Sequence, residues 1–273
     1  MSPDRPSGSF SAASSDGTQM AWTAHGNAGA PAVVMMHSLG SNGSMWTPQI
    51  SALSADFHVI AVDTRGHGRS SAPAGDYHVD QLGADVLTIA DHIGIEQFHA
   101  VGLSLGGQMA MWLALNAPDR VRSLVLANTG AKIGTHDLWQ ARIDAVTTDG
   151  MLSIRDAVLA RWFAPGFADR HPDWFAEAQD TFAATDPAGY AGCCAALRES
   201  DLRASVGAIV APTLVIGGEL DLATPPADVE WLHRHISTSE LMILDQAAHL
   251  SNLDREPQFT ARLTQFLSSA VDD

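Results

Sequence analysis

Short, mostly apolar runs recur along the chain and are separated by longer segments with a different pattern. Each run has four or five residues and is followed closely by glycine, serine or aspartate; the runs cover 33–36, 58–62, 99–102, 123–126, 213–216 and 240–244. Strands that are covered by helices on both faces of a parallel sheet have this composition. We therefore predict six strands of a buried parallel sheet.

The segments between those runs carry apolar residues at helical spacing. The clearest examples are Leu82, Val86, Ile89 and Ile93 and, near the carboxyl end, Phe259, Leu263, Phe266 and Leu267. Before the first run, 10–13 and 20–25 flank a Ser-Asp-Gly turn and are typical of an antiparallel hairpin. The alternation predicts an α/β fold with right-handed crossovers and a mostly parallel, eight-stranded, doubly wound sheet.

The alternation of strands and helices stops between residues 130 and 205. This stretch has no strand pattern, is interrupted by Asp-Gly, Pro-Gly and Asp-Pro pairs, and is rich in tryptophan and phenylalanine. It is too long for a loop of a compact domain. We predict a helical insertion, the cap segment (130–205), in a core domain made of 1–129 and 206–273.

Charge narrows the range of partners for this chain of 273 residues. Acidic residues outnumber basic ones by 31 to 15, which gives a net charge of −16, and Lys132 is the sole lysine. A field of this sign repels nucleic acid and anionic lipid surfaces, so we expect neither as a partner. Apolar residues make up 46% of the chain and charged residues 17%, as in globular enzymes. The sequence leaves a homo-oligomer open.

Cysteine content and the amino terminus bear on the compartment. Cys193 and Cys194 are adjacent, and neighbouring cysteines rarely form a disulfide because the intervening peptide would be strained. We interpret them as small apolar residues in a reducing compartment. Residues 1–10 lack the pattern of a signal peptide, and no run approaches the ~18 apolar residues of a membrane span. These features predict a cytoplasmic protein.

The sequence Gly-Leu-Ser-Leu-Gly at 102–106 follows a predicted strand and opens a predicted helix. In that context G-x-S-x-G is a nucleophile elbow, which presents the hydroxyl of Ser104 at a sharp turn. A glycine-rich connection without chemistry is the alternative, since five-residue patterns occur by chance. A dinucleotide-binding fingerprint is disfavoured because Ser104 stands where its middle glycine should be.

A nucleophilic serine needs a base and a carboxylate that orients the base. In the chain order of this elbow, the acid follows a later strand and the histidine follows the last one. His249 occupies the position of the base. Asp221 is the preferred acid, while Glu219 is closer to the strand and is interpreted as a turn or surface residue. His233 and His235 do not resemble a metal site.

Backbone donors and a second polar motif complete the predicted site. We expect the N–H groups of Leu105, after the nucleophile, and Leu39, in the loop after the 33–36 strand, to form the oxyanion hole. The motif Asp-Thr-Arg-Gly-His-Gly-Arg-Ser at 63–70 suggests chemistry, but we interpret it as a structural turn held by its own charged side chains.

With these residues placed, the chain resembles the α/β-hydrolase superfamily and, within it, the 3-oxoadipate enol-lactonases of the β-ketoadipate pathway of aromatic catabolism. The resemblance spans residues 8 to 268. It rests on HSLGSNGSMW (37–46), DTRGHGRSS (63–71), GLSLGG (102–107), LANTGAKIGT (126–135) and AAHLSN (247–252). Of these, LANTGAKIGT is the more specific, because it enters the cap segment.

The resemblance implies a carboxylic ester hydrolase that opens a five-membered enol lactone with a short carboxylate arm. Catalysis would use Ser104, His249 and Asp221 through an acyl-enzyme, without cofactor or metal. The substrate carboxylate needs a cation as its partner, and Lys132 and Arg142 are the candidates. The alternative for each is a solvated charge on the surface. Trp139 is a candidate for the pocket wall, or else a core residue.

Three other functions use the same three residues. They are a general carboxylesterase, a hydrolase of carbon–carbon bonds in ring-cleavage products, and a ligand receptor with slow turnover. Haloalkane dehalogenases and soluble epoxide hydrolases are disfavoured, because their nucleophile at the elbow is aspartate and position 104 is serine.

Overall fold

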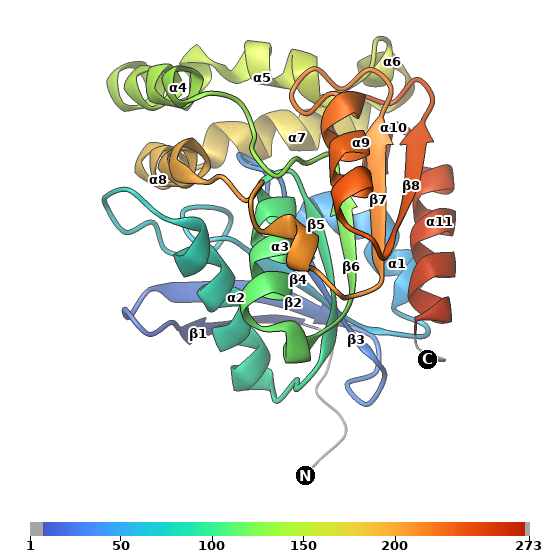
Figure 1. Ribbon diagram of the computed structural model, residues 1–273. Helices are drawn as coiled ribbons and strands as arrows, with labels where there is room; N and C mark the ends of the chain where they lie inside the picture. Colours follow the sequence, from blue (N-terminus) through green and yellow to red (C-terminus); the bar gives the residue numbers. More distant parts are fainter. Residues whose placement is uncertain (1–7, 271–273) are drawn as a thin grey trace.

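Residues 8–270 are described by a computed structural model, in which one mixed sheet carries helices on both faces (Figure 1). The strands are β1 (Gly8–Ala13), β2 (Gln19–His25), β3 (Ala32–Met36), β4 (His58–Asp63), β5 (Phe98–Leu103), β6 (Val121–Ala127), β7 (Thr213–Gly218) and β8 (Ser239–Leu244). Their order in the sheet is β1-β2-β4-β3-β5-β6-β7-β8. The predicted fold class, an eight-stranded and mostly parallel sheet, is confirmed.

The strands differ in direction and in burial. The hairpin β1–β2 is antiparallel, and β2 also pairs antiparallel with β4, whereas all pairs from β4 through β3, β5, β6 and β7 to β8 are parallel. Every residue of β3, β4, β5 and β7 is buried, which explains why these strands are apolar on both faces. Strand β8 lies at the sheet edge and is only partly buried.

Helices cover the two faces of the sheet. They are α1 (Thr47–Leu53), α2 (Val79–Ile93), α3 (Leu105–Asn116), α9 (Pro226–His235), α10 (Ser251–Asp254) and α11 (Glu256–Ser269). Helices α1 and α11 pack together over one face, and α2, α3 and α9 lie over the other (Figure 1). Within 8–270, no helix combines the length and the apolar character that crossing a bilayer requires.

The chain between β6 and β7 forms a layer of helices beyond the carboxyl ends of the parallel strands (Figure 1). They are α4 (His136–Asp149), α5 (Arg155–Trp162), α6 (Phe167–Arg170), α7 (Pro172–Ala184) and α8 (Pro187–Glu199). No strand occurs in this described stretch. The division into a core domain and the cap segment stays a prediction, and residues 1–7 and 271–273 of that core, with most of the segment searched for a signal peptide, lie outside the described residues.

The two adjacent cysteines are buried in α8. Neither forms a disulfide within the described chain. Burial raises the pKa of the Cys194 thiol to about 12 and that of Cys193 well above its ordinary value. Both side chains are therefore neutral, and they pack as small apolar groups, as the sequence suggested.

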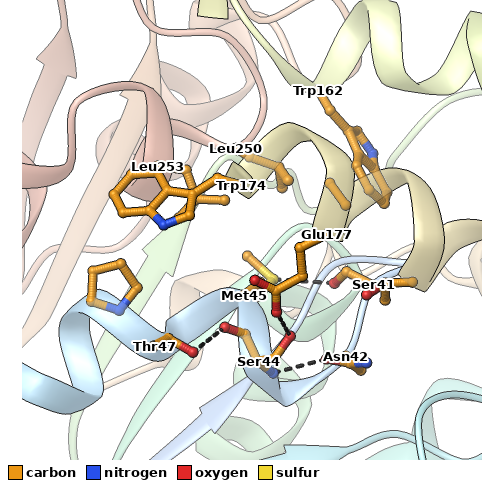
Figure 2. Close-up of a pocket in the computed structure, with 13 residues that line it drawn as sticks. Ser41, Asn42, Ser44, Met45, Thr47, Trp162, Trp174, Glu177, Leu250 and Leu253 are labelled. Carbon is orange, nitrogen blue, oxygen red and sulfur yellow. Dashed lines mark hydrogen bonds between the residues drawn. The ribbon is translucent and has the colours of Figure 1, made fainter. Parts of the chain in front are cut away.

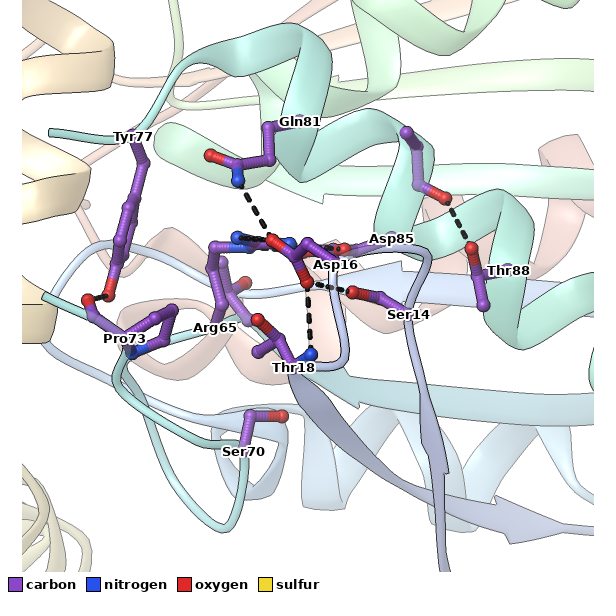
Figure 3. Close-up of polar contacts among 12 residues, drawn as sticks. Ser14, Asp16, Thr18, Arg65, Ser70, Pro73, Tyr77, Gln81, Asp85 and Thr88 are labelled. Carbon is purple, nitrogen blue, oxygen red and sulfur yellow. Dashed lines mark hydrogen bonds and ion pairs between the residues drawn. The ribbon is translucent and has the colours of Figure 1, made fainter. Parts of the chain in front are cut away.

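The 63–70 motif forms a turn that is tied to the core by ion pairs. The guanidinium of Arg65 makes two bonds to Asp85 of α2, at 2.6 and 2.7 Å, and a third to Asp16 of the hairpin turn, at 2.8 Å (Figure 3). Within the motif itself, Arg69 binds Asp63 at 3.1 Å. The turn is thus held by its charged side chains, in agreement with the structural interpretation.

Removal of Asp85 should destabilise the protein, because it leaves a buried guanidinium without its main partner. The side chains of Arg65 and Asp85 are only 2% and 4% exposed. We expect Asp85→Ala to lower the free energy of unfolding by about 3 kcal/mol in chemical denaturation. The matched control is Asp91→Ala in the same helix, where an exposed pair with Arg120 is lost and the change should stay below about 1 kcal/mol. Equal effects of the two substitutions would contradict this account.

Candidate active site

Ser104 lies in the sharp turn between β5 and α3, with φ 58° and ψ −113°. Positive φ is costly for a residue with a side chain, so the surrounding structure must enforce it. Two glycines allow the close packing that does this. A Cβ on Gly102 would lie 2.0 Å from the carbonyl oxygen of Gly106, and a Cβ on Gly106 would lie 2.2 Å from that of Met36. Only glycine fits at these two positions.

Hydrogen bonds hold the turn from both sides. The Ser104 N–H donates to the carbonyl of Ala127 at 3.0 Å, and the hydroxyl of Thr129 donates to the Ser104 carbonyl at 2.8 Å. Both partners come from the end of β6 and the residues after it. The neighbouring strand therefore fixes the direction of the Ser104 side chain, which is almost fully buried and faces a cavity.

His249 and Asp221 meet beside this turn. The loop after β7 carries Asp221 and the loop after β8 carries His249, and the Nδ1 atom of His249 lies 2.9 Å from Oδ2 of Asp221. An ionised carboxylate can only accept, so Nδ1 carries the proton and Nε2 is left free to accept one. Glu219 is not involved, because its carboxylate accepts from Gln246 at the surface. Of the two acids considered, Asp221 is the one that the fold brings to the histidine.

Several donors surround the Asp221 carboxylate. The amide of Asn128 and the hydroxyl of Thr224 donate to Oδ2 at 2.9 and 2.7 Å, and the N–H groups of Ala223 and Thr224 donate to Oδ1. Burial on its own would raise the pKa of Asp221, but the adjacent His249 and these hydrogen bonds outweigh it and lower the pKa to about 2. The carboxylate is therefore ionised and fixed in orientation.

Asn128 was not predicted as a site residue. Its backbone adopts φ 44°, and its side chain also donates to the carbonyl of Ala248 and accepts from the hydroxyl of Ser251. It thus links the end of β6 to the loops of both Asp221 and His249. The available signal was an asparagine directly after a buried strand, since asparagine tolerates positive φ more readily than most residues.

Two backbone N–H groups are placed as possible donors to an oxyanion. Leu105 is the first residue of α3, where a helix offers no acceptor for the N–H group. In the loop after β3, the N–H of Gly40 donates to Nε2 of His67 at 2.9 Å, and the N–H of Gly106 donates to the carbonyl of His37. The first bond fastens the Leu39 loop to the 63–70 motif, and the second fastens it to the start of α3. The N–H of Leu39 makes no hydrogen bond to any residue within 8–270.

Most of the predicted site residues share one cavity of about 540 Å³, part of it open to solvent. It is lined by Ser38, Leu39, Ser104, Ile133, Gly134, Leu138, Trp139, Arg142, Val158, Arg161, Trp162, Ala223 and His249. We call it the catalytic cavity. Its lining, mostly apolar with a few polar and charged groups, is typical of small-molecule sites. Lys132 is not brought to it: its Nζ lies 3.9 Å from the Asp201 carboxylate.

Two arginines give the catalytic cavity a positive wall. Arg142 lies over the ring of Trp139 at 5.2 Å and donates to the hydroxyl of Tyr190 at 3.3 Å, and Arg161 comes from the last turn of α5. Neither arginine forms an ion pair with any carboxylate in the described part of the chain. Arg161 was not predicted as a binding residue, although it lies in the cap segment, directly before Trp162.

Metal ligands are not grouped in the described chain. Across residues 8–270, no three histidine, cysteine, aspartate or glutamate side chains lie together in a way that could hold a metal ion. His233 donates to or accepts from the Ser239 hydroxyl at 2.9 Å, and His235 stacks on Trp231.

Comparison with known proteins gives a consistent set of relatives. Residues 31–256 match the family described as alpha/beta hydrolase fold. The chain is 42% identical to 3-oxoadipate enol-lactonase 2 of Acinetobacter baylyi over 234 residues, and this match covers 86% of this chain and 87% of that protein. It is 31% identical to the putative carbamate hydrolase RutD of Agrobacterium fabrum, over 92% of this chain and 99% of the relative.

Solved structures agree with this picture. The crystal structure of the enol-lactonase from Burkholderia xenovorans LB400 superposes with a TM-score of 0.93 at 40% identity, and the match covers 95% of this chain and all of that one. A hydrolase from Pseudomonas aeruginosa PA01 superposes with a TM-score of 0.92 at 38% identity, over 95% and 98% of the two chains.

The lowered pKa of Asp221 should appear in the pH dependence of stability. Because its pKa falls from an ordinary value of 3.8 to about 2 on folding, the stabilisation is complete above pH 3.8 and is lost as the pH falls towards 2. We expect Asp221→Asn to reduce the free energy of unfolding by about 2 kcal/mol at pH 7, and the difference to shrink below pH 4. Urea denaturation at several pH values measures this.

The control is Asp245→Asn, which neutralises an exposed aspartate in the loop before His249. It should leave the stability and its pH dependence close to those of the unmodified protein. A difference between Asp221→Asn and the unmodified protein that stays constant from pH 7 to pH 3 would contradict the proposed cause.

Proposed function

The chain belongs to the alpha/beta hydrolase fold family, and from this premise we propose that it opens the lactone ring of 3-oxoadipate enol-lactone to give 3-oxoadipate. The observation that carries the proposal is the pair of arginines, Arg142 and Arg161, which line the same cavity as Ser104 and His249 and form no ion pair with a carboxylate of residues 8–270. In a protein of net charge −16, such cations are suited to an anionic substrate. The identity to proteins named 3-oxoadipate enol-lactonase supports the same substrate.

The first half of the reaction forms an acyl-enzyme. Nε2 of His249 takes the proton of the Ser104 hydroxyl while Oγ attacks the lactone carbonyl carbon. Negative charge collects on the carbonyl oxygen, where the N–H groups of Leu39 and Leu105 stabilise it. Asp221 keeps the imidazole in the required tautomer and stabilises the imidazolium. The ring C–O bond then breaks and leaves the acyl group on Ser104.

The leaving group is an enolate rather than an alkoxide. Because an enolate is the weaker base, it departs readily, and its protonation by the imidazolium of His249 is less demanding. In the second half, water gives a proton to Nε2 and attacks the acyl carbon, which releases the carboxylate and restores the Ser104 hydroxyl. The enol formed from the leaving group tautomerises to the ketone of 3-oxoadipate. Besides the substrate and one water molecule, these steps use side chains and backbone groups of this chain.

The positive wall would bind the substrate's carboxylate arm. Arginine suits this purpose because its planar guanidinium can donate two parallel hydrogen bonds to a carboxylate. Both arginines belong to the cap segment, so we propose that this segment determines which substrates bind. Trp139 would form part of the wall, since its indole lies under Arg142 and its Nε1 donates to the Ile133 carbonyl at 2.6 Å.

A comparison of substrates tests the reaction. We expect a kcat/KM of at least ~10⁴ M⁻¹s⁻¹ for the enol lactone, an ordinary enzyme value, and much lower values for p-nitrophenyl acetate and for a vinylogous diketone acid. Ser104→Ala should lose at least ~10³-fold on every substrate. A higher kcat/KM for the aryl ester would contradict the lactonase proposal and favour a general carboxylesterase. A higher kcat/KM for the diketone acid would favour a carbon–carbon bond hydrolase. Turnover far below ~1 s⁻¹ on all three would favour a receptor.

Substitution of the arginines tests the substrate contact. We expect Arg142→Ala and Arg161→Ala each to raise KM for the anionic lactone about tenfold, the value of one charge-assisted hydrogen bond, and to leave KM for neutral p-nitrophenyl acetate unchanged. Lys132→Ala tests the remaining candidate and should have a smaller effect, because Lys132 faces Asp201. Equal changes for the lactone and the neutral ester would show that the arginines do not bind the carboxylate.

A further inference from the structure

A second cavity lies directly beside the catalytic cavity. It has a volume of about 500 Å³, part of it open to solvent. It is lined by Ser41, Asn42, Ser44, Met45, Thr47, Pro48, Trp162, Trp174, Glu177, Ala178, Thr181, Leu250 and Leu253 (Figure 2). We call it the side cavity. None of Ser104, Asp221 and His249 lines it.

Trp162 lines both cavities and lies between them. Two other stretches of chain are divided between the two cavities. His249 lines the catalytic cavity and the next residue, Leu250, lines the side cavity; Leu39 lines the catalytic cavity and Ser41 the side cavity. Three separate stretches of chain therefore pass from one cavity to the other. The two cavities are therefore neighbours, and Trp162 faces both of them.

The position of Trp162 is fixed by its contacts. Its carbonyl accepts from the N–H of Leu250 at 2.8 Å, and the carbonyl of Arg161 accepts from the N–H of His249 at 3.4 Å. The indole packs edge-on against Phe182 at a centroid distance of 5.7 Å and is only 3% exposed. A side chain that is held in this way acts as a wall rather than as a mobile flap.

We propose that Trp162 limits the length of the acyl group that Ser104 can accept, by closing the catalytic cavity off from the side cavity. This role rests on the proposed hydrolase function, because it concerns the substrate that Ser104 attacks. With the wall in place, the catalytic cavity holds a compact group such as a five-membered ring. Without it, a longer chain would extend into the side cavity.

The lining of the side cavity indicates which chains would enter. Met45, Leu250 and Leu253 offer apolar surface, while the Glu177 carboxylate, bound to the Ser44 hydroxyl at 2.8 Å, carries a negative charge (Figure 2). Like charges repel, so a chain that ends in a carboxylate would be disfavoured there. The side cavity therefore suits neutral alkyl chains, whereas the positive wall of the catalytic cavity suits anions.

The test is the chain-length preference of Trp162→Ala on p-nitrophenyl esters. Each methylene taken from water is worth ~0.8 kcal/mol, or about fourfold in kcat/KM. We expect the ratio of kcat/KM for octanoate to that for acetate to rise at least about tenfold over the unmodified enzyme. Mono-p-nitrophenyl suberate, of the same length with a terminal carboxylate, should gain much less.

Two control variants locate the effect. Trp174→Ala enlarges the side cavity without touching the wall and should leave the octanoate-to-acetate ratio unchanged. Ala178→Phe fills the side cavity, so adding it to Trp162→Ala should abolish most of the gain. If the gain persists in the double variant, the chain does not enter the side cavity and the proposal is wrong.

A second substitution covers a failure of Trp162→Ala to fold. Trp162→Phe keeps a ring against Phe182 and should give a smaller rise in the same ratio, with the folded fraction measured by titrating Ser104 with a fluorophosphonate. An unchanged ratio in both Trp162 variants would overturn the proposal. The ester assays are independent of the lactone assay described above. If the ester ratio shifts but the unmodified enzyme does not open the lactone, the lactone is rejected as the substrate and the role of Trp162 is retained.

Discussion

The backbone of Ser104 can hold a positive φ only because two chain segments approach one another more closely than any side chain would allow. Gly102 and Gly106 make that approach possible, and the end of β6 with the residues after it completes it, through Ala127 and Thr129. Ser104, the first N–H of α3 and the loop of Leu39 take their relative positions from this one packing arrangement. The remaining groups of the site are placed against it by the order of strands in the sheet.

Charged side chains of the described residues are paired near the sheet but not in the catalytic cavity. Buried carboxylates near the sheet are matched by donors: Asp85 by Arg65, and Asp221 by His249, Asn128 and Thr224. In the cap segment, Arg142 and Arg161 line one cavity and form no ion pair with a carboxylate of residues 8–270. Two such cations in one cavity of an acidic protein give that cavity a local field opposite to the overall field, which favours anions there.

Much of the fold could be predicted from the sequence, because strands that are buried on both faces leave runs of apolar residues that few other structures produce. The association of Asp221 with His249 was also accessible, since it follows from the order of elements after the elbow. The contribution of Asn128 was not, because its partners lie some 90 to 120 residues away and only the folded sheet brings them together. Which cations of the cap segment face the cavity was equally hidden: Lys132 and Arg142 are ten residues apart, yet of these two only Arg142 reaches the cavity.

The N–H groups of His249 and Leu250 donate to the carbonyls of Arg161 and Trp162, so the loop after β8 is joined to the end of α5 backbone to backbone. The imidazole of His249 is therefore held from two sides, by Asp221 through its ring and by a cap helix through its own main chain. A substitution that shifts the end of α5 would displace this imidazole even though, within residues 8–270, no side chain of the cap segment is hydrogen-bonded to Asp221.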